Sequence, residues 1–152
     1  MDIRPWRATD IPQLIPLLVD ALAAGAARGE AIIADEHNAT FYAQLGVAQA
    51  EGGHPTLCAV DGEDILGFVM WSWCELPLHV AWKVCFAGNS YVRPDARHRG
   101  VANALRQAAG LRCRAAGVER IIGPVHLVNT RGIQEFVRQG AWPTSVQMEV
   151  LV

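Results

Sequence analysis

The chain has 152 residues, of which 51% are hydrophobic and 18% are charged. Globular proteins have about 25% charged residues, so this apolar composition excludes an intrinsically disordered chain. The formal net charge of −2 argues against a general nucleic-acid binder, because it provides no overall attraction to a phosphate backbone. A chain of this length buries about 70% of its unfolded surface on folding, and we expect one domain over residues 1–152.

The charge is unevenly distributed along the chain. Residues 93–120 contain seven arginines and two acids, a local charge of +5, which leaves −7 for the rest of the chain. A short cationic segment on an acidic protein favours a small anionic ligand over a long polyanion, although arginines also solvate exposed helices. The functional site is therefore expected within this segment.

Cysteine usage and the N-terminus bear on the compartment. The four cysteines are Cys58, Cys74, Cys85 and Cys113. They form no C-x-x-C pair and have no zinc-finger spacing, so neither a metal site nor a disulfide framework is expected, which fits a reducing cytoplasm. The N-terminus has no signal-like apolar region, and the longest apolar run, residues 14–27, is interrupted by Pro16, Asp20 and Gly25. We therefore expect neither a signal peptide nor a membrane span.

The first half of the chain begins with a short extended segment, residues 2–6. Thr9 is suited to cap a first helix, because apolar residues follow at helical spacing between positions 11 and 22. Pro16 should kink this helix or delay its start. A second helix is expected over residues 36–50. The pair Gly52 and Gly53, which follows Glu51, should end it.

Strands follow in the middle of the chain. An Asp-Gly turn joins two apolar runs, residues 56–60 and 65–75, which predicts an antiparallel hairpin. A third strand is expected over residues 80–92. Gly88 inside it indicates a bulge or a close approach of two backbones.

The second half alternates between helix and strand. Residues 101–116 are predicted to form a helix with arginines on one side, and residues 118–128 a strand, in which Pro124 requires an unpaired edge. A helix over residues 130–139 and a strand over residues 145–152 complete the chain. The order β-α-α-β-β-β-α-β-α-β predicts an α/β sandwich with helices on both faces of a mixed sheet.

The most informative motif lies where a strand meets a helix, in residues 91–105. A turn at Pro94 is followed by Arg97, Gly100 and Ala102, in the pattern Arg-x-x-Gly-x-Ala. The first N–H groups of a helix have no internal partner and lie at the positive end of its dipole. Small residues at 100 and 102 let phosphate oxygens approach the main chain. The motif matches neither the P-loop nor the dinucleotide fingerprint, so we expect another kind of anion site.

This pattern meets the Q/R-x-x-G-x-G/A signature of the GNAT acyltransferase superfamily, which the chain resembles over nearly its whole length. Three further segments are similar to the family in the same order, namely residues 3–11, 65–69 and 129–140. The resemblance implies a mixed, mostly antiparallel sheet whose fourth and fifth strands are parallel and splay apart around an acyl-pantetheine arm. Pro124 would then lie where ladder bonds are missing.

The resemblance also implies a site for acetyl-CoA. Its residues would be Ser90, Tyr91, Val92, Arg97, His98, Arg99, Gly100, Val101, Ala102, Asn103, Asn129 and Phe136. Residues 97–103 would bind the pyrophosphate, and residues 90–92 would align with the pantetheine and polarise the acyl carbonyl. Asn129 would contact the pantetheine or start the following helix. Phe136 stands where the family often has a tyrosine near the sulfur, so that hydroxyl is missing, although departure of a thiolate remains feasible.

Transfer to an amine requires a base, because an amine with a pKa near 10 is mostly protonated at pH 7. Glu75 and His126 are the two candidates. Glu75 would suit this role in an apolar setting and is otherwise a solvated carboxylate at a strand end. His126 is either a base of the residue type most used for proton transfer near neutral pH or a hydrogen-bonded core residue.

The sequence thus predicts an N-acetyltransferase that moves an acetyl group from acetyl-CoA to an amine of a small molecule or peptide by direct attack on the thioester. No metal, nucleic acid or membrane partner is expected. The first two helices and residues 76–80 would read the acceptor, and a homodimer is compatible with the five tryptophans. Two alternatives are a non-catalytic acyl-CoA-binding or sensing domain and a module whose arginine-rich loop contacts an acidic protein.

Overall fold

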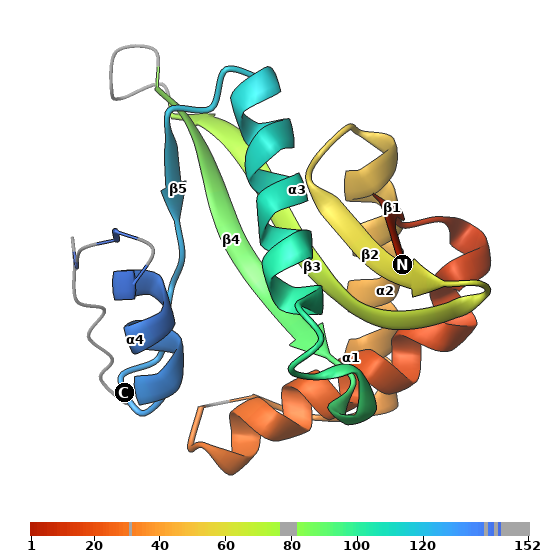
Figure 1. Cartoon of the computed structure of the whole chain (residues 1–152). Coiled ribbons are helices and arrows are strands. Elements are labelled where there is room, and N and C mark those ends of the chain that lie inside the picture. Colours follow the sequence, from red (N-terminus) through yellow and green to blue (C-terminus); the bar gives the residue numbers. More distant parts are fainter. Residues whose placement is uncertain (31, 77–81, 139, 142, 144–152) are drawn as a thin grey trace.

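The computed structural model describes the chain except residues 31, 77–81, 139, 142 and 144–152. The helices and strands are β1 (Asp2–Pro5), α1 (Ile11–Ala27), α2 (Glu36–Glu51), β2 (Thr56–Asp61), β3 (Asp64–Leu76), β4 (Trp82–Val92), α3 (Val101–Ala115), β5 (Arg120–Ile122) and α4 (Thr130–Arg138). In this described part, the five strands form one sheet in the order β1-β2-β3-β4-β5 (Figure 1). Neighbours are antiparallel except β4 and β5, which are parallel. The predicted mixed α/β fold is confirmed.

The sheet carries a hydrophobic core on each face, because alternate residues of a strand point to opposite sides. On one face, α1 and α2 cover a cluster that contains Trp6 and Phe68, whose ring centroids lie 5.3 Å apart edge to face. On the other face, α3 covers a cluster that contains Val69 and the fully buried Leu105 (Figure 1). Helices therefore lie on both faces of the sheet, as the sequence predicts.

Helix α1 begins at Ile11 and continues through Pro16, so the delayed start considered for it is wrong. Pro16 lies on the exposed side of the helix, where water can satisfy the carbonyl that loses its intrahelical partner. Residues Ala8–Ala27, with a mean hydropathy of 1.3, are long and apolar enough to cross a membrane by length and composition alone. In the structure, Leu14, Leu18 and Leu22 of this helix are buried against α2 and the sheet.

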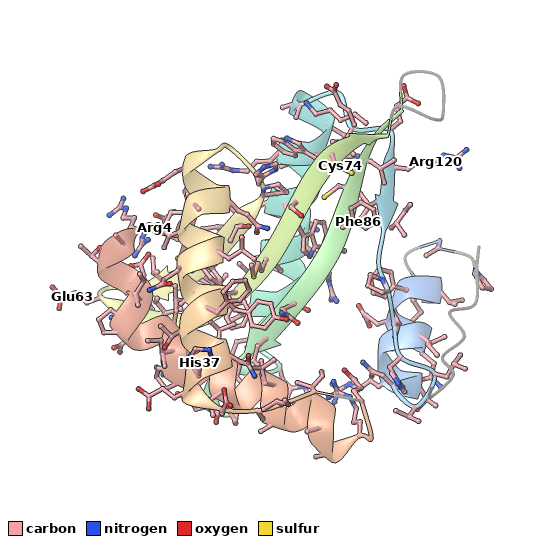
Figure 2. The ribbon with its side chains drawn as sticks, turned by 180° about the vertical axis from the view of Figure 1, so that it is seen from behind. Arg4, His37, Glu63, Cys74, Phe86 and Arg120 are labelled. Atoms are coloured by element: carbon pink, nitrogen blue, oxygen red, sulfur yellow. The ribbon has the colours of Figure 1, made fainter. Side chains whose placement is uncertain are left out.

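Thr9 does not cap the first helix. It lies inside a short 3-10 turn, Ala8–Asp10, and Asp10 is the residue that precedes α1. The Asp10 carboxylate accepts the backbone N–H of Arg7 at 2.8 Å and two guanidinium hydrogen bonds from Arg4, labelled in Figure 2. A charged acceptor with three donors outcompetes the threonine hydroxyl, so the buried Asp10 organises this corner.

The pairing of β3 with β4 shifts register in the middle of the hairpin. Val69 is opposite Ser90 and Trp71 is opposite Ala87, so Met70 opposes the two residues Gly88 and Asn89. A Cβ on Gly88 would lie 2.7 Å from the carbonyl oxygen of Met70. Both readings of Gly88, a bulge and a close backbone approach, are therefore confirmed.

Strand β5 is much shorter than residues 118–128, the range predicted for it. It pairs with β4 only through the register Val84↔Arg120 to Phe86↔Ile122; Figure 2 labels Phe86 and Arg120 in this paired part. Pro124 lies two residues beyond the end of β5, so its missing N–H interrupts no ladder bond. Among the described residues, positions 87–92 of β4 have no partner on this edge. The strand predicted over residues 145–152 lies outside the described residues.

His54, which precedes β2, hydrogen-bonds to the part of β3 that extends past the first residue of β2. Its Nδ1 accepts the backbone N–H of Trp73 at 3.2 Å, and the two ring centroids lie 5.0 Å apart. Burial, aided by the positive charge of Lys83, lowers the pKa of His54. The folded state therefore favours the neutral imidazole, which can accept this bond.

Acidification is expected to destabilise the protein through His54. Because its folded pKa is depressed, its contribution is fully present above the unfolded pKa of about 6.5 and is lost as the pH falls from there through the lower folded pKa. His54→Gln, whose amide oxygen accepts the bond without titrating, is expected to flatten this part of the pH dependence. Urea unfolding at pH 7.5, 6.5 and 5.5 measures the free energy of unfolding of both proteins. An equal loss of stability in the wild type and in His54→Gln would contradict the role assigned to His54.

Candidate active site

The segment that joins β4 to α3 passes through a short 3-10 helix, Pro94–Ala96, and a four-residue loop. Ala96 is fully buried and anchors the loop on the core under α3. His98 and Gly100 have positive φ angles of 62° and 81°, a conformation that glycine adopts at little cost. Gly100 precedes α3 without a side-chain cap. The first N–H groups of α3 therefore face the loop unopposed by a capping side chain, as an anion site requires.

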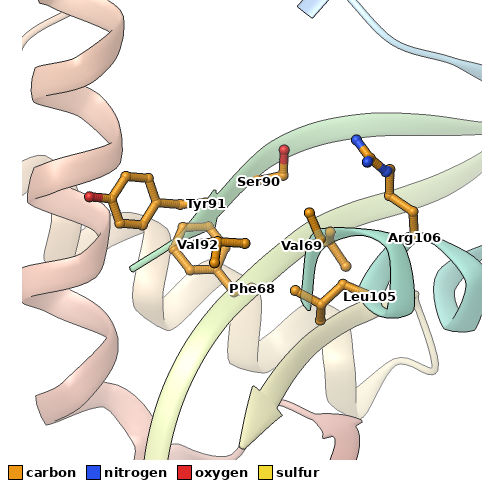
Figure 3. A pocket seen from close by; sticks show the side chains of 8 residues that line it. Phe68, Val69, Ser90, Tyr91, Val92, Leu105 and Arg106 are labelled. Carbon is orange, nitrogen blue, oxygen red and sulfur yellow. The ribbon is translucent and has the colours of Figure 1, made fainter. Parts of the chain in front are cut away.

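A groove with a volume of about 390 Å³ runs along this segment. A second cavity of about 130 Å³ adjoins it, and Figure 3 shows Val69 and Leu105 beside this cavity. The two share five lining residues, which are Ser90, Tyr91, Val92, Ala102 and Arg106. The end of β4, the loop and the start of α3 thus form one continuous concave surface.

Most of the residues that the family resemblance assigns to acetyl-CoA meet at this surface. The groove is lined by Ser90, Tyr91, Val92, Arg97, His98, Gly100, Val101, Ala102 and Asn103. They are brought together because the edge of β4 and the first turn of α3 are adjacent in space. Arg99, Asn129 and Phe136 do not line it.

The arginines of the loop have separate partners. Arg93 donates to Asp95 at 2.7 and 2.9 Å, and this bond lowers the pKa of the Asp95 carboxyl. The Nε of Arg97 donates to the carbonyl of Val92 at 3.1 Å, and its guanidinium lies 5.5 Å from the Tyr91 ring centroid. Arg97 therefore fixes the loop against the end of β4 and forms one wall of the groove.

Arg99 and Asn129 lie outside the groove and contact neighbouring protein groups. The guanidinium of Arg99 lies 3.8 Å from the carboxylate of Asp61, the last residue of β2. Asn129 Oδ1 accepts the N–H of Gly132 at 3.0 Å. A Cβ on Gly132 would lie 2.8 Å from the Asn129 amide nitrogen, so glycine makes room for this cap. Of the two roles considered for Asn129, the start of α4 is the one that these contacts display.

Phe136 faces the protein body. A Cβ on Gly123 would lie 2.5 Å from the Cζ atom of Phe136, and the ring packs against the core under α3. The tip of the ring therefore points at the glycine, and a tyrosine hydroxyl on that carbon would be directed at the Gly123 backbone. The local packing accounts for phenylalanine at this position.

Neither candidate base lines the groove or the cavity. Glu75 is an exposed residue of β3, opposite Lys83. It is separated by four residues, on the order of 13 Å along the strand, from Trp71 at the β3 bulge. His126 is exposed in the segment between β5 and α4, and its carbonyl accepts the N–H of Asn129 at 2.8 Å. The prediction that His126 lies on a strand is wrong, because β5 ends at Ile122.

Sequence reasoning missed two arginines that line the groove, Arg106 on α3 and Arg131 on α4. The Nη2 of Arg106 donates to Glu135 at 2.9 Å and so ties α3 to α4. The Nε of Arg106 is buried and has no partner among the described residues. The spacing of Ala102 and Arg106, four residues apart on one helix face, was a usable signal. Arg131 lies in the segment 129–140 that resembles the family, but its place in the groove depends on how α4 packs.

The fold is that of an N-acetyltransferase. The family model for the acetyltransferase (GNAT) family matches residues 21–141, and the chain belongs to this family. A comparison with curated proteins by sequence yields no match. Within the described residues, no group of three or more His, Cys, Asp or Glu side chains is placed to hold a metal ion.

Solved structures share the fold at low sequence identity. A mutant form of the BH1408 protein from Bacillus halodurans has a TM-score of 0.82 and 20% identity, over 100% of this chain and 99% of that one. The ribosomal-protein-alanine N-acetyltransferase from Brucella melitensis biovar Abortus has a TM-score of 0.68 and 19% identity, over 100% and 99%. Aminoglycoside N-acetyltransferase AAC(6')-Iy in complex with CoA has a TM-score of 0.74 and 17% identity, over 99% and 93%.

Proposed function

We propose that the protein transfers an acetyl group from acetyl-CoA to an amine of a small molecule or peptide, by direct attack of the amine on the thioester. The observation that carries this proposal is the continuity of the groove, from the left-handed start of α3 at Gly100 to the unpaired edge of β4. The first part suits a diphosphate and the second suits the amides of an extended arm.

Each part of the groove has a separate task in this proposal. The N–H groups from Val101 to Asn103 bind the diphosphate, and the small Ala102 leaves the approach open. The edge of β4 at residues 90–92 aligns the pantetheine, and a backbone N–H there stabilises the oxyanion of the tetrahedral intermediate. Val69 and Leu105 supply the apolar wall of the second cavity, which adjoins the groove.

The acceptor amine must lose a proton before it attacks. Glu75 and His126 remain the proposed bases, and because neither lines the groove, each would act through water. Phe136 provides no proton, so the coenzyme departs as a thiolate and is protonated by water. The charge of −7 outside residues 93–120 favours a cationic acceptor. Two of the similar structures are named for amine acceptors, a ribosomal-protein alanine and an aminoglycoside.

Acetyl-CoA is expected to raise the melting temperature. A ligand at 100 times its dissociation constant stabilises by about 2.7 kcal/mol, or about 5–10 °C for a chain of this size. Differential scanning fluorimetry with millimolar acetyl-CoA measures the shift, and ATP, which lacks the pantetheine arm, is the control ligand. Absence of a shift would rule out both the enzyme and the sensing domain.

Turnover separates the enzyme from a sensing domain. Release of free thiol from acetyl-CoA over a panel of amines is expected, and binding without release for every amine would favour sensing. With an accepted amine, Glu75→Gln and His126→Gln identify the base, because loss of a general base costs about 10²–10⁴ in rate. An unchanged kcat in either variant excludes that residue.

A further inference from the structure

The larger groove is lined by guanidinium groups from three elements and, within the described residues, by no carboxylate. Arg97 comes from the loop, Arg106 from α3 and Arg131 from the first turn of α4. A diphosphate carries about two negative charges and is already served by the N–H groups of α3. Three guanidinium groups therefore suit a ligand with more negative charge than a diphosphate.

Two of the three are held by protein groups. Arg97 is bound to the carbonyl of Val92, and Arg106 is paired with Glu135 at 2.9 Å. Within the part of the chain that the structure describes, no carboxylate forms an ion pair with Arg131, which is exposed on the groove wall. A guanidinium has five N–H donors, so Arg131 offers a planar fork to a ligand.

Arg131 is held at a defined place. It lies four residues before Glu135, so the two side chains share one face of α4. Since Glu135 is bound to Arg106, that face is turned toward α3. The cap from Asn129 Oδ1 to the N–H of Gly132 fixes the same helical turn. Arg131 therefore faces the start of α3 from the opposite wall of the groove.

We propose that Arg131 binds the 3′-phosphate of coenzyme A and so selects the complete coenzyme over its 3′-dephospho form. This inference rests on the proposed function. A phosphate monoester carries about −1.5 to −2 charge at pH 7 and accepts two parallel hydrogen bonds from a guanidinium. The start of α3 binds the diphosphate that both forms contain, whereas Arg131 contacts the group that distinguishes them.

Calorimetric titration with coenzyme A and with 3′-dephospho-coenzyme A tests the assignment. The wild-type protein is expected to bind coenzyme A on the order of tenfold more tightly, the value of one charge-assisted contact. Arg131→Gln is expected to reduce this preference to about twofold or less, with the affinity for the dephospho form nearly unchanged. Arg131→Lys, which keeps the charge but not the fork, is expected to retain part of the preference.

Arg114→Gln is the matched control, because it removes the same charge from an exposed position of α3 outside the groove. It is expected to keep the full preference. Equal weakening of both ligands by Arg131→Gln, or an unchanged ratio, overturns the inference and leaves the proposed function standing. If the wild-type protein binds neither ligand, the proposed function fails and this inference fails with it.

Discussion

Gly100→Glu is expected to abolish the acetyl-CoA-dependent rise in melting temperature and to reduce turnover at least about 100-fold, a loss of roughly 2.7 kcal/mol in transition-state stabilisation. Gly100 has a φ of 81°, and a Cβ built there meets nothing within 4 Å. A glutamate side chain therefore extends into open space at the start of α3. Its carboxylate competes with the diphosphate for the same N–H groups and repels it.

Gly117→Glu is the matched control at the other end of α3. Gly117 has a φ of 72° and equally open surroundings, and it does not line the groove. Both variants bear the same cost of about 1–2 kcal/mol for a left-handed non-glycine residue, so both are expected to melt earlier. Only Gly100→Glu is expected to lose the ligand-dependent shift. A full shift in Gly100→Glu would place the donor elsewhere.

Gly88→Val is expected to destabilise the protein by about 1–3 kcal/mol and to weaken acetyl-CoA binding at least about tenfold. The new Cβ would lie 2.7 Å from the Met70 carbonyl oxygen. That oxygen belongs to the β3 backbone and cannot move without disturbing the hairpin. Relief of the clash shifts β4 beyond the bulge, where residues 90–92 line the groove. Urea unfolding and calorimetric titration measure the two effects.

Asn89→Val places the same side chain at the other residue of the bulge, where a Cβ is already accommodated. It is expected to bind acetyl-CoA nearly as the wild type does. A Gly88→Val protein with wild-type stability and affinity would show that the close approach at the bulge does not control the geometry of β4. Equal effects of both substitutions would attribute the loss to valine in the bulge rather than to the missing room at Gly88.

Helices and strands were predicted well from the sequence where one face of the element is buried and a turn residue ends its apolar pattern. The hairpin around the Asp-Gly turn, the bulge at Gly88 and the helix after Gly100 all appear as predicted. These features depend on side-chain periodicity and on backbone conformations that few residues adopt. The Thr9 cap and the delayed helix start at Pro16 were predicted wrongly, because the partners of Asp10 and the exposure of Pro16 are set by the folded protein.

The structure around β5 and α4 could not be predicted from local sequence patterns. The apolar run after position 118 resembles a long strand, yet β5 contains three residues. A strand ends where its neighbour diverges, and β4 offers β5 a paired edge only over Val84–Phe86. The direction of the Phe136 ring and the distance of Glu75 from the groove likewise depend on packing between elements.

The sequence by itself determined the class of fold, the family and the cationic start of α3, because each is encoded in residues that are close together along the chain. The tertiary structure decided what faces that helix across the groove. Arg106 and Arg131 lie 25 positions apart in the sequence, and they line one groove only because the Arg106 to Glu135 ion pair joins α3 to α4. No local pattern specifies such a contact, since its residues are brought together by the packing of two separate helices.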